Sequence, residues 1–255
     1  MEGGENLSPE RRRDRMKAFA KKAVSVPLSV RTGDLRKRAA SGIVMLAIAV
    51  GTLWAGGIVR DAFFVIVGLS CLFELARLVM RATTRLFVRL LGIVGGAAYI
   101  GYAVYLLMMI DVVPLLVLLF GMVICVDTFA YFFGRTLGGP KIAPRISPSK
   151  TWAGLLGGAI GATLAIVLYG QWGLPEEVNG PVAAYSAVVA GIAIAIIAQS
   201  GDFFESWLKR KAGMKDSSNL IPGHGGIFDR IDGLIPVVIL VGTMLIVKYP
   251  HWLVV

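Results

Sequence analysis

Seven apolar stretches, each close to the length of a membrane-crossing helix, limit what this chain can fold into. They cover about residues 40–59, 62–79, 90–110, 112–133, 152–170, 183–200 and 233–249. A helix needs roughly 20 mostly apolar residues to cross the bilayer core, and the chain is 56% hydrophobic and only 16% charged. We therefore expect an all-α, polytopic transmembrane bundle of about seven spans, or eight or nine if half-spans lie within 203–228.

Basic residues distinguish the two ends of such a bundle. If the N-terminus is cytoplasmic, the segments on that side hold 24 of the 26 lysines and arginines. Because Lys and Arg concentrate in cytoplasmic loops, the net charge of +10 indicates topology, and we expect no nucleic-acid partner. Loops 134–151 and 201–232 then face the cytoplasm. If the source is bacterial, we expect the protein in the inner membrane.

The N-terminal residues, 1–38, differ from the membrane domain that we place at 39–255. Within this arm, 9–38 has apolar residues at helical spacing among its bases. That pattern fits an interfacial helix on anionic headgroups or, equally, a disordered tail that sets topology. The arm lacks the short apolar region and cleavage site of a removable signal peptide. Cys71 and Cys125 lie in apolar stretches and are interpreted as packing residues.

The stretch 152–170 carries glycines at GxxxG spacing, from Gly154 to Gly158 and from Gly157 to Gly161. Small residues at that spacing let two helices approach closely. The pattern favours packing within the bundle and leaves a homodimer as the alternative.

The segment 201–232 holds five acids and five bases between two apolar stretches. A loop that only set topology would not need matched acids. Asp229 and Asp232 share one face if their segment is helical, and Asp202 ends the preceding apolar stretch. Clustered carboxylates near phosphate need a cation between them, and oxygen ligands favour Mg²⁺. The alternative is that Asp229 and Asp232 cap the following helix.

Other residues of this segment suit phosphate binding. Cationic side chains pair with phosphate oxygens, and a glycine turn lets backbone N–H groups approach an anion. A lone histidine in a turn is more often structural than catalytic. The candidates are Lys209, Arg210, Lys215, His224, Gly225, Gly226 and Arg230.

Two further groups lie outside this segment. Ser147, Lys150 and Thr151 precede an apolar stretch, where they suit either a phosphate or a helix cap. Asp127 lies within the stretch 112–133. An acid inside a span is a functional candidate by default, and its alternative role is as a structural partner for Arg135 or another buried base.

These residues together resemble the signature of the phosphatidate cytidylyltransferases, the CDP-diacylglycerol synthases. The main pattern is Ser206-x2-Lys209-Arg210-x4-Lys215-Asp216-x-Ser218-x2-Ile221-Pro222-x-His224-Gly225-Gly226-Ile227-x-Asp229-Arg230-Ile231-Asp232. Shorter pieces match at Asp127–Arg135, Ser147–Thr151 and Gln199–Asp202, so the resemblance covers about 120–235. Ser218 stands where many members have Gly, and Ser149 where many have a base.

The resemblance implies transfer of CMP from CTP to phosphatidate, which yields CDP-diacylglycerol and pyrophosphate at a site in 120–235 on the cytoplasmic face. It implies Mg²⁺, with a second cation as an option, held by carboxylates among Asp202, Asp229, Asp232 and Asp127. It implies that the catalytic residues are Asp202, Asp229, Asp232, Lys215 and Asp216. The substrate-binding residues would be Ser147, Lys150, Thr151, Ser206, Lys209, Arg210, His224, Gly225, Gly226 and Arg230.

Two other functions stay open at this point. One is a CTP-dependent cytidylyltransferase that acts on an ether-lipid phosphate. The other, from a different class, is an ion-coupled transporter, whose charges would lie within spans on several helices.

Overall fold

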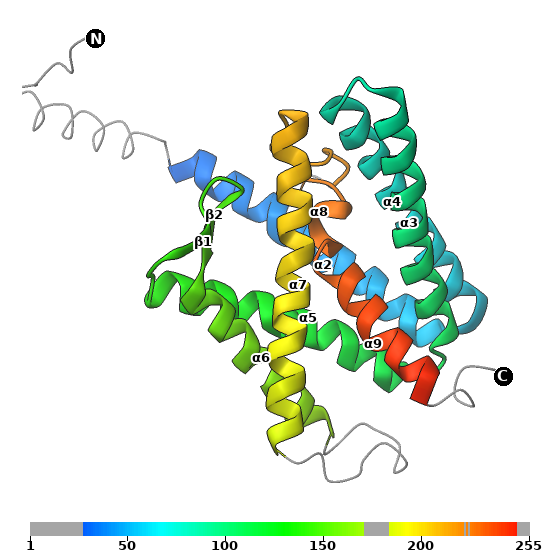
Figure 1. The fold of residues 1–255 in the computed structure, drawn as a ribbon. Coiled ribbons are helices and arrows are strands. Elements are labelled where there is room, and N and C mark those ends of the chain that lie inside the picture. Colours follow the sequence, from blue (N-terminus) through cyan, green and yellow to red (C-terminus); the bar gives the residue numbers. More distant parts are fainter. Residues whose placement is uncertain (1–27, 171–183, 222, 224, 249–255) are drawn as a thin grey trace, which may run out of the picture.

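The computed structural model describes residues 28–170, 184–221, 223 and 225–248. Throughout this part the chain is helical apart from one β-hairpin and the connecting loops (Figure 1). The elements are α2 (Leu28–Ala55), α3 (Gly57–Ala82), α4 (Leu86–Met109), α5 (Val113–Thr136), β1 (Lys141–Ala143), β2 (Ser147–Thr151), α6 (Trp152–Gly170), α7 (Ala184–Ala212), α8 (Phe228–Ile231) and α9 (Leu234–Lys248).

The apolar stretches of the sequence coincide with these helices. Among the described residues, five helices are long and apolar enough to cross a membrane, namely α3, α4, α5, α6 and α7. Two shorter apolar helical segments, Ala40–Ala55 and Leu234–Lys248, correspond to the first and last predicted stretches. The predicted all-α transmembrane bundle is confirmed by these helices. Helices suit this environment because backbone amides inside a bilayer can form hydrogen bonds only within helices or closed barrels.

Helix α7 continues well past the predicted end of its apolar stretch, as far as Ala212. The loop predicted over 201–232 therefore begins only after Ala212. Gln199, Asp202, Glu205 and Lys209 recur three or four positions apart on this extension, so they form one polar stripe along α7. The helix keeps its backbone hydrogen-bonded while it presents these side chains to one side.

The interior of the bundle is apolar, and so is much of its outer surface. Leu78 on α3, Leu106 on α4, Leu116 on α5 and Val237 on α9 are fully buried. Many other large apolar side chains of the same helices are exposed. In a soluble protein such surface would be a liability, whereas on these helices it suits contact with lipid.

The glycine face of α6 packs directly on α5. A Cβ at Gly157 would lie 2.7 Å from the carbonyl oxygen of Phe129, and one at Gly161 would lie 2.6 Å from that of Cys125. The GxxxG pattern thus serves packing within the bundle, as favoured from the sequence. The homodimer stays a prediction.

At the other end of the bundle from the C-terminus of α7, a buried arginine joins two segments. Arg60, one of two bases outside the predicted cytoplasmic segments, is 3% exposed and donates to Asp61 at 3.1 Å and to Asp111 at 2.8 Å. These contacts tie the start of α3 to the turn between α4 and α5.

The described part of the predicted basic arm continues directly into the bundle. Helix α2 runs without a break from Leu28 through the apolar segment that ends at Ala55. The boundary predicted between 38 and 39 therefore falls inside one helix. The choice between an interfacial helix and a tail concerns 9–38; residues 28–38 belong to helix α2, and 9–27 lie outside the described residues.

Candidate active site

The β-hairpin carries Lys150 to the polar stripe of α7. Strands β1 and β2 pair in antiparallel fashion, with Lys141 opposite Thr151. The ammonium of Lys150 donates to the carboxylate of Asp202 and forms an ion pair with it. The hairpin is also held at its turn, where the Arg210 guanidinium donates to the carbonyl of Ile146 at 3.4 Å.

Asp202 also lies against Asp232, at the junction of α8 and α9. The two carboxylates are close enough to share a hydrogen bond, and burial together with the charge of Asp202 raises the pKa of Asp232 well above its ordinary range. Gly201 permits this approach, because a Cβ there would collide with the backbone carbonyl of Asp232. Two adjoining carboxylates cannot both ionise without a compensating cation.

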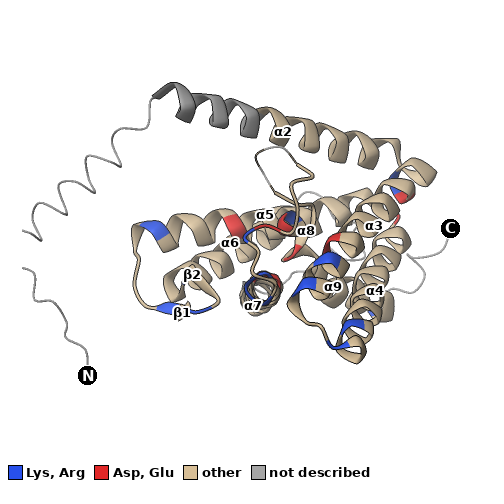
Figure 2. Cartoon of the chain, turned by 90° about the horizontal axis from the view of Figure 1, so that it is seen from above, with Lys and Arg blue, Asp and Glu red and all other residues tan. Residues whose placement is uncertain are grey.

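Asp127 on α5 faces the same group. The charges of Asp202, Lys150 and Arg230 all act on its carboxylate. Arg135, its predicted alternative partner, instead donates to the Tyr131 hydroxyl at 2.9 Å. In Figure 2, which looks along α7, acidic and basic segments of α5, α7 and α8 gather around the end of α7. Four separate chain segments thus contribute charge to one region.

Asp229 belongs to a second set of contacts. Its carboxylate accepts from the Lys209 ammonium at 2.8 Å and from the backbone N–H groups of Ser217 at 2.9 Å and Gly226 at 2.8 Å. Burial opposes its ionisation, but hydrogen bonding with Glu205, Lys209 and Gly226 outweighs burial and holds the pKa of Asp229 below its ordinary value. Asp229 is therefore an ionised acceptor that fastens the loop between α7 and α8.

Glu74, near the middle of α3, fastens the same loop from the other side. Its buried carboxylate accepts the hydroxyls of Ser217 and Ser218 and the backbone N–H groups of Ile227 at 3.1 Å and Phe228 at 2.8 Å. Four donors satisfy a charge that would otherwise be costly to bury. Gly226 leaves room for this carboxylate, since a Cβ there would collide with Glu74 and Ser217.

The carboxylates of Asp202 and Asp232 adjoin each other and could bind Mg²⁺ together. Within the described residues, no group of three or more His, Cys, Asp or Glu side chains is placed to hold a metal ion. Mg²⁺ usually takes only one or two protein carboxylates and fills its shell with water and substrate phosphate oxygens. The adjoining carboxylates of Asp202 and Asp232 fit that pattern, because a cation between them would relieve their repulsion.

Comparison with known proteins places the chain in a family. Residues 90–247, well over half of the chain, match the family model described as "Cytidylyltransferase family". The chain belongs to the cytidylyltransferase family. The matched segment of this family begins in α4 and ends in α9, so it includes the hairpin, the polar stripe of α7 and the loop that Asp229 fastens.

Three similar proteins share one name. A "Phosphatidate cytidylyltransferase" of Rickettsia typhi is 35% identical over 203 residues, which cover 78% of this chain and 86% of the relative. Proteins with the same name from Brucella abortus and Rickettsia felis are 46% and 44% identical over 127 and 125 residues. The matches cover 42% and 54% of the lengths of those two relatives.

The structure brings half of the predicted site residues together in two adjoining clusters. The first contains Asp127, Lys150, Asp202, Arg230 and Asp232, and the second contains Lys209, Gly226 and Asp229. The two aspartates expected to share one face, Asp229 and Asp232, point to different clusters. Whether Asp229 also binds metal stays a prediction.

The other described residues of the predicted set lie on the hairpin, on α7 and in the loop after α7. Thr151 accepts from the Gly154 N–H at 3.0 Å and so caps α6, the alternative weighed for it. Ser147 is buried in β2, and Ser206 is half-buried on α7. Lys215 and Asp216 are exposed on the loop after α7, where Asp216 adjoins Gly225. His224 lies outside the described residues.

Three residues of the site were not among the predicted set. Glu74 and Ser217 anchor the signature loop, and Glu205 forms an ion pair with Lys209. The rule that an acid inside a span is a functional candidate, applied to Asp127, would also have selected Glu74. Ser217 had no comparable signal, because a serine in a loop is ordinary.

Proposed function

We propose that this protein transfers CMP from CTP to phosphatidate. An oxygen of the lipid phosphate attacks the α-phosphorus of CTP, and the bond from that phosphorus to the β-phosphate bridging oxygen breaks. The products are CDP-diacylglycerol and pyrophosphate. The observation that carries the proposal is the convergence of Lys150, Asp202 and Asp232 from three segments, in a family whose named relatives are phosphatidate cytidylyltransferases.

The chemistry needs neutralised charge and fixed geometry more than a protein nucleophile. Both reactants are polyanions, and the lipid phosphate is already ionised at neutral pH. Lys150 and Arg230 would offset charge on the triphosphate and hold the reacting groups in line. Lys215 and Arg210, exposed at the rim, would meet the outer phosphates. Asp229 and Glu74 would act indirectly, since they hold the loop that leads into α8, the helix that carries Arg230.

Mg²⁺ is the proposed cofactor. Asp202 and Asp232 would hold it, with Asp127 nearby, and it would supply charge neutralisation at the phosphate oxygens. With the metal bound to Asp202, the Lys150 ammonium would become available to a phosphate oxygen.

The site is proposed to face the cytoplasm, where CTP is present. The basic hairpin, the end of α7 and the turn between α3 and α4 belong to the segments that hold most of the lysines and arginines, and such segments stay inside. Phosphatidate would keep its acyl chains in the bilayer while its phosphate reaches the polar clusters.

The test is a turnover assay on the purified full-length chain in vesicles that contain phosphatidate. Radiolabelled CTP should yield a lipid-soluble cytidine product, and a chelator should abolish it. Asp202→Asn should reduce turnover at least 100-fold, in line with the loss of charge stabilisation at a reaction centre. The matched control is Asp111→Asn, which removes a carboxylate at the opposite end of the bundle and should retain turnover.

The turnover assay, together with an ion-flux measurement on the same vesicles, also tests the two alternative functions. An ether-linked phosphatidate analogue turned over in preference to the diacyl lipid would favour the ether-lipid enzyme. A chain that gives no product with either lipid but carries ions across vesicles would be a transporter, and the proposed reaction would be wrong.

A further inference from the structure

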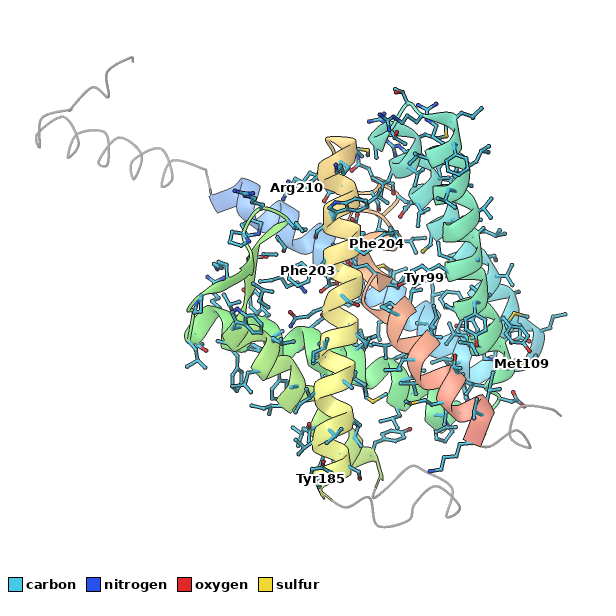
Figure 3. The ribbon with its side chains drawn as sticks, in the orientation of Figure 1. Tyr99, Met109, Tyr185, Phe203, Phe204 and Arg210 are labelled. Carbon is cyan, nitrogen blue, oxygen red and sulfur yellow. The ribbon has the colours of Figure 1, made fainter. Side chains whose placement is uncertain are left out.

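An apolar groove of about 750 Å³ runs between α4 and α7, on the far side of α7 from Asp202. Its walls are aliphatic and aromatic side chains of α3, α4 and α7, among them Leu75, Leu91 and Trp207. Tyr99 and Phe204 meet between the two helices, with ring centroids 6.3 Å apart (Figure 3). The volume falls in the range of small-molecule sites.

Helical geometry separates this groove from the polar stripe. At 3.6 residues per turn, Phe204, Trp207 and Lys211 occupy the face of α7 opposite Asp202 and Lys209. The groove still reaches Ser200 and Gly201, the residues that immediately precede Asp202. Its apolar interior is therefore distinct from the candidate active site but ends beside it.

The rim of the groove is cationic. Arg85, in the turn before α4, and Lys211, near the end of α7, line it together with Thr83. Among the described residues, neither cation forms an ion pair with an acid. Arg89, in contrast, is occupied by the carbonyls of Thr83 at 2.7 Å and Met80 at 2.9 Å. The α3–α4 turn and the end of α7 lie at the same end of the bundle (Figure 1).

Glycines of α4 keep the groove open. A Cβ at Gly95 would meet no atom within 4 Å, although Gly95 lines the groove. A large side chain at this position would therefore fill the groove without displacing the backbone. Unfilled apolar space with an unpaired cationic rim, on a lipid-facing bundle, suits an amphiphile with an acidic head.

We propose that this groove is a binding site for phosphatidate, with acyl chain between α4 and α7 and phosphate at Arg85 and Lys211. Two cations and a hydroxyl match the charge of a phosphate monoester better than that of a phosphodiester. The groove's chemistry requires an anionic phospholipid, and the choice of phosphatidate rests on the proposed function. The groove is a holding site beside the reaction centre: because α7 separates Lys211 from Asp202, phosphatidate must leave it before its phosphate reaches the polar clusters.

Trp207 provides a reporter inside the groove. The full-length chain with Trp207 as its only tryptophan, the others replaced by phenylalanine, is reconstituted in phosphatidylcholine vesicles without CTP. Brominated phosphatidate should quench Trp207 at a mole fraction roughly tenfold lower than brominated phosphatidylcholine. Brominated phosphatidylglycerol should quench less effectively than phosphatidate. A chain with Trp54 as its only tryptophan, 92% exposed on α2, reports on bulk lipid and should show little preference.

Three variants test whether the preferential quenching of Trp207 arises from lipid bound in the groove. Gly95→Phe should abolish the preferential quenching because it fills the groove, and Arg85→Gln with Lys211→Gln should abolish the preference for phosphatidate. Arg77→Gln with Arg81→Gln removes two charges near the same turn, away from the groove, and should leave the preference intact.

Three results would overturn the proposal: equal quenching by phosphatidate and phosphatidylcholine, a preference that survives Gly95→Phe, or equal quenching by phosphatidylglycerol. The assay needs no turnover. Preferential quenching without product would reject the proposed reaction and keep a phosphatidate site, whereas product without preferential quenching would reject only the groove.

Discussion

Ser217 donates its hydroxyl at 2.9 Å to the carboxylate of Glu74, a residue 143 positions earlier in the chain. The same hydroxyl lies 2.9 Å from the carboxylate of Asp229. A buried serine thus joins the signature loop to a helix outside the family's matched segment, which begins at residue 90. The position of the signature loop depends on α3.

Replacement of Glu74 by alanine should release this loop. Each buried donor left without an acceptor costs about 1–3 kcal/mol, and four donors contact Glu74. We expect turnover to fall at least tenfold and the loop 213–227 to become sensitive to protease. Ser218→Gly removes one of the four contacts and serves as the control, with turnover near normal. A Glu74→Ala protein with normal turnover and a resistant loop would contradict the anchoring role.

The pair between Lys150 and Asp202 should couple the hairpin to α7. A double-mutant cycle with Lys150→Met and Asp202→Asn, read out as thermal stability in detergent, should give a coupling energy of about 1 kcal/mol. Both side chains are mostly buried, at 23% and 15% exposed, which reduces solvent screening. Lys141→Met, an exposed base on the same hairpin, is the matched control and should show no coupling with Asp202→Asn. Additive effects at Lys150 would mean that the contact contributes nothing.

Gly201→Ala should separate Asp202 from Asp232. The added methyl group would collide with the Asp232 carbonyl, which is backbone and has little freedom to move. We expect a loss of turnover of tenfold or more, together with reduced stability. Gly121→Ala, where a Cβ meets nothing within 4 Å, should be silent. The comparison requires both variants to be inserted at similar levels, measured by quantitative immunoblot.

Metal dependence should distinguish Asp202 from Asp229, two aspartates of the family signature. Asp202→Asn should raise the Mg²⁺ concentration for half-maximal turnover of any residual activity, because it removes a proposed ligand. Asp229→Asn should instead expose the loop to protease, because it weakens an acceptor of three donors. If Asp229→Asn shifts the Mg²⁺ requirement and leaves the loop resistant, Asp229 binds the metal directly.

The orientation of the bundle in the membrane can be measured by labelling two single-cysteine variants. Lys141→Cys, exposed on β1, in a chain with Cys71 and Cys125 replaced by alanine, should react with a membrane-impermeant maleimide only from the cytoplasmic side. Asp111→Cys, at the opposite end, should react only from outside. The reverse pattern would place the site on the other face.

Local patterns predicted the helices well, and they predicted their ends less well. The stretch 112–133 corresponds to α5, at Val113–Thr136. The stretch 183–200 continues as helix to Ala212, because a polar residue at every third or fourth position does not interrupt backbone hydrogen bonding. Hydropathy detects where a helix leaves the lipid and carries no information on where the helix itself stops.

The sequence by itself determined that this chain is a bundle of apolar helices, with most of its lysines and arginines in a few polar segments, and which residues match the family signature. Both follow from neighbours in the chain: a long apolar segment must satisfy its own amides, and a dense signature is visible without coordinates. The tertiary structure alone decided that Lys150 meets Asp202, that Asp229 and Asp232 point to different clusters, and that Glu74 holds the loop. The contacts of Lys150 with Asp202 and of Glu74 with Phe228 join residues 52 and 154 positions apart, and only helix packing, with glycines at its closest contacts, brings them within reach.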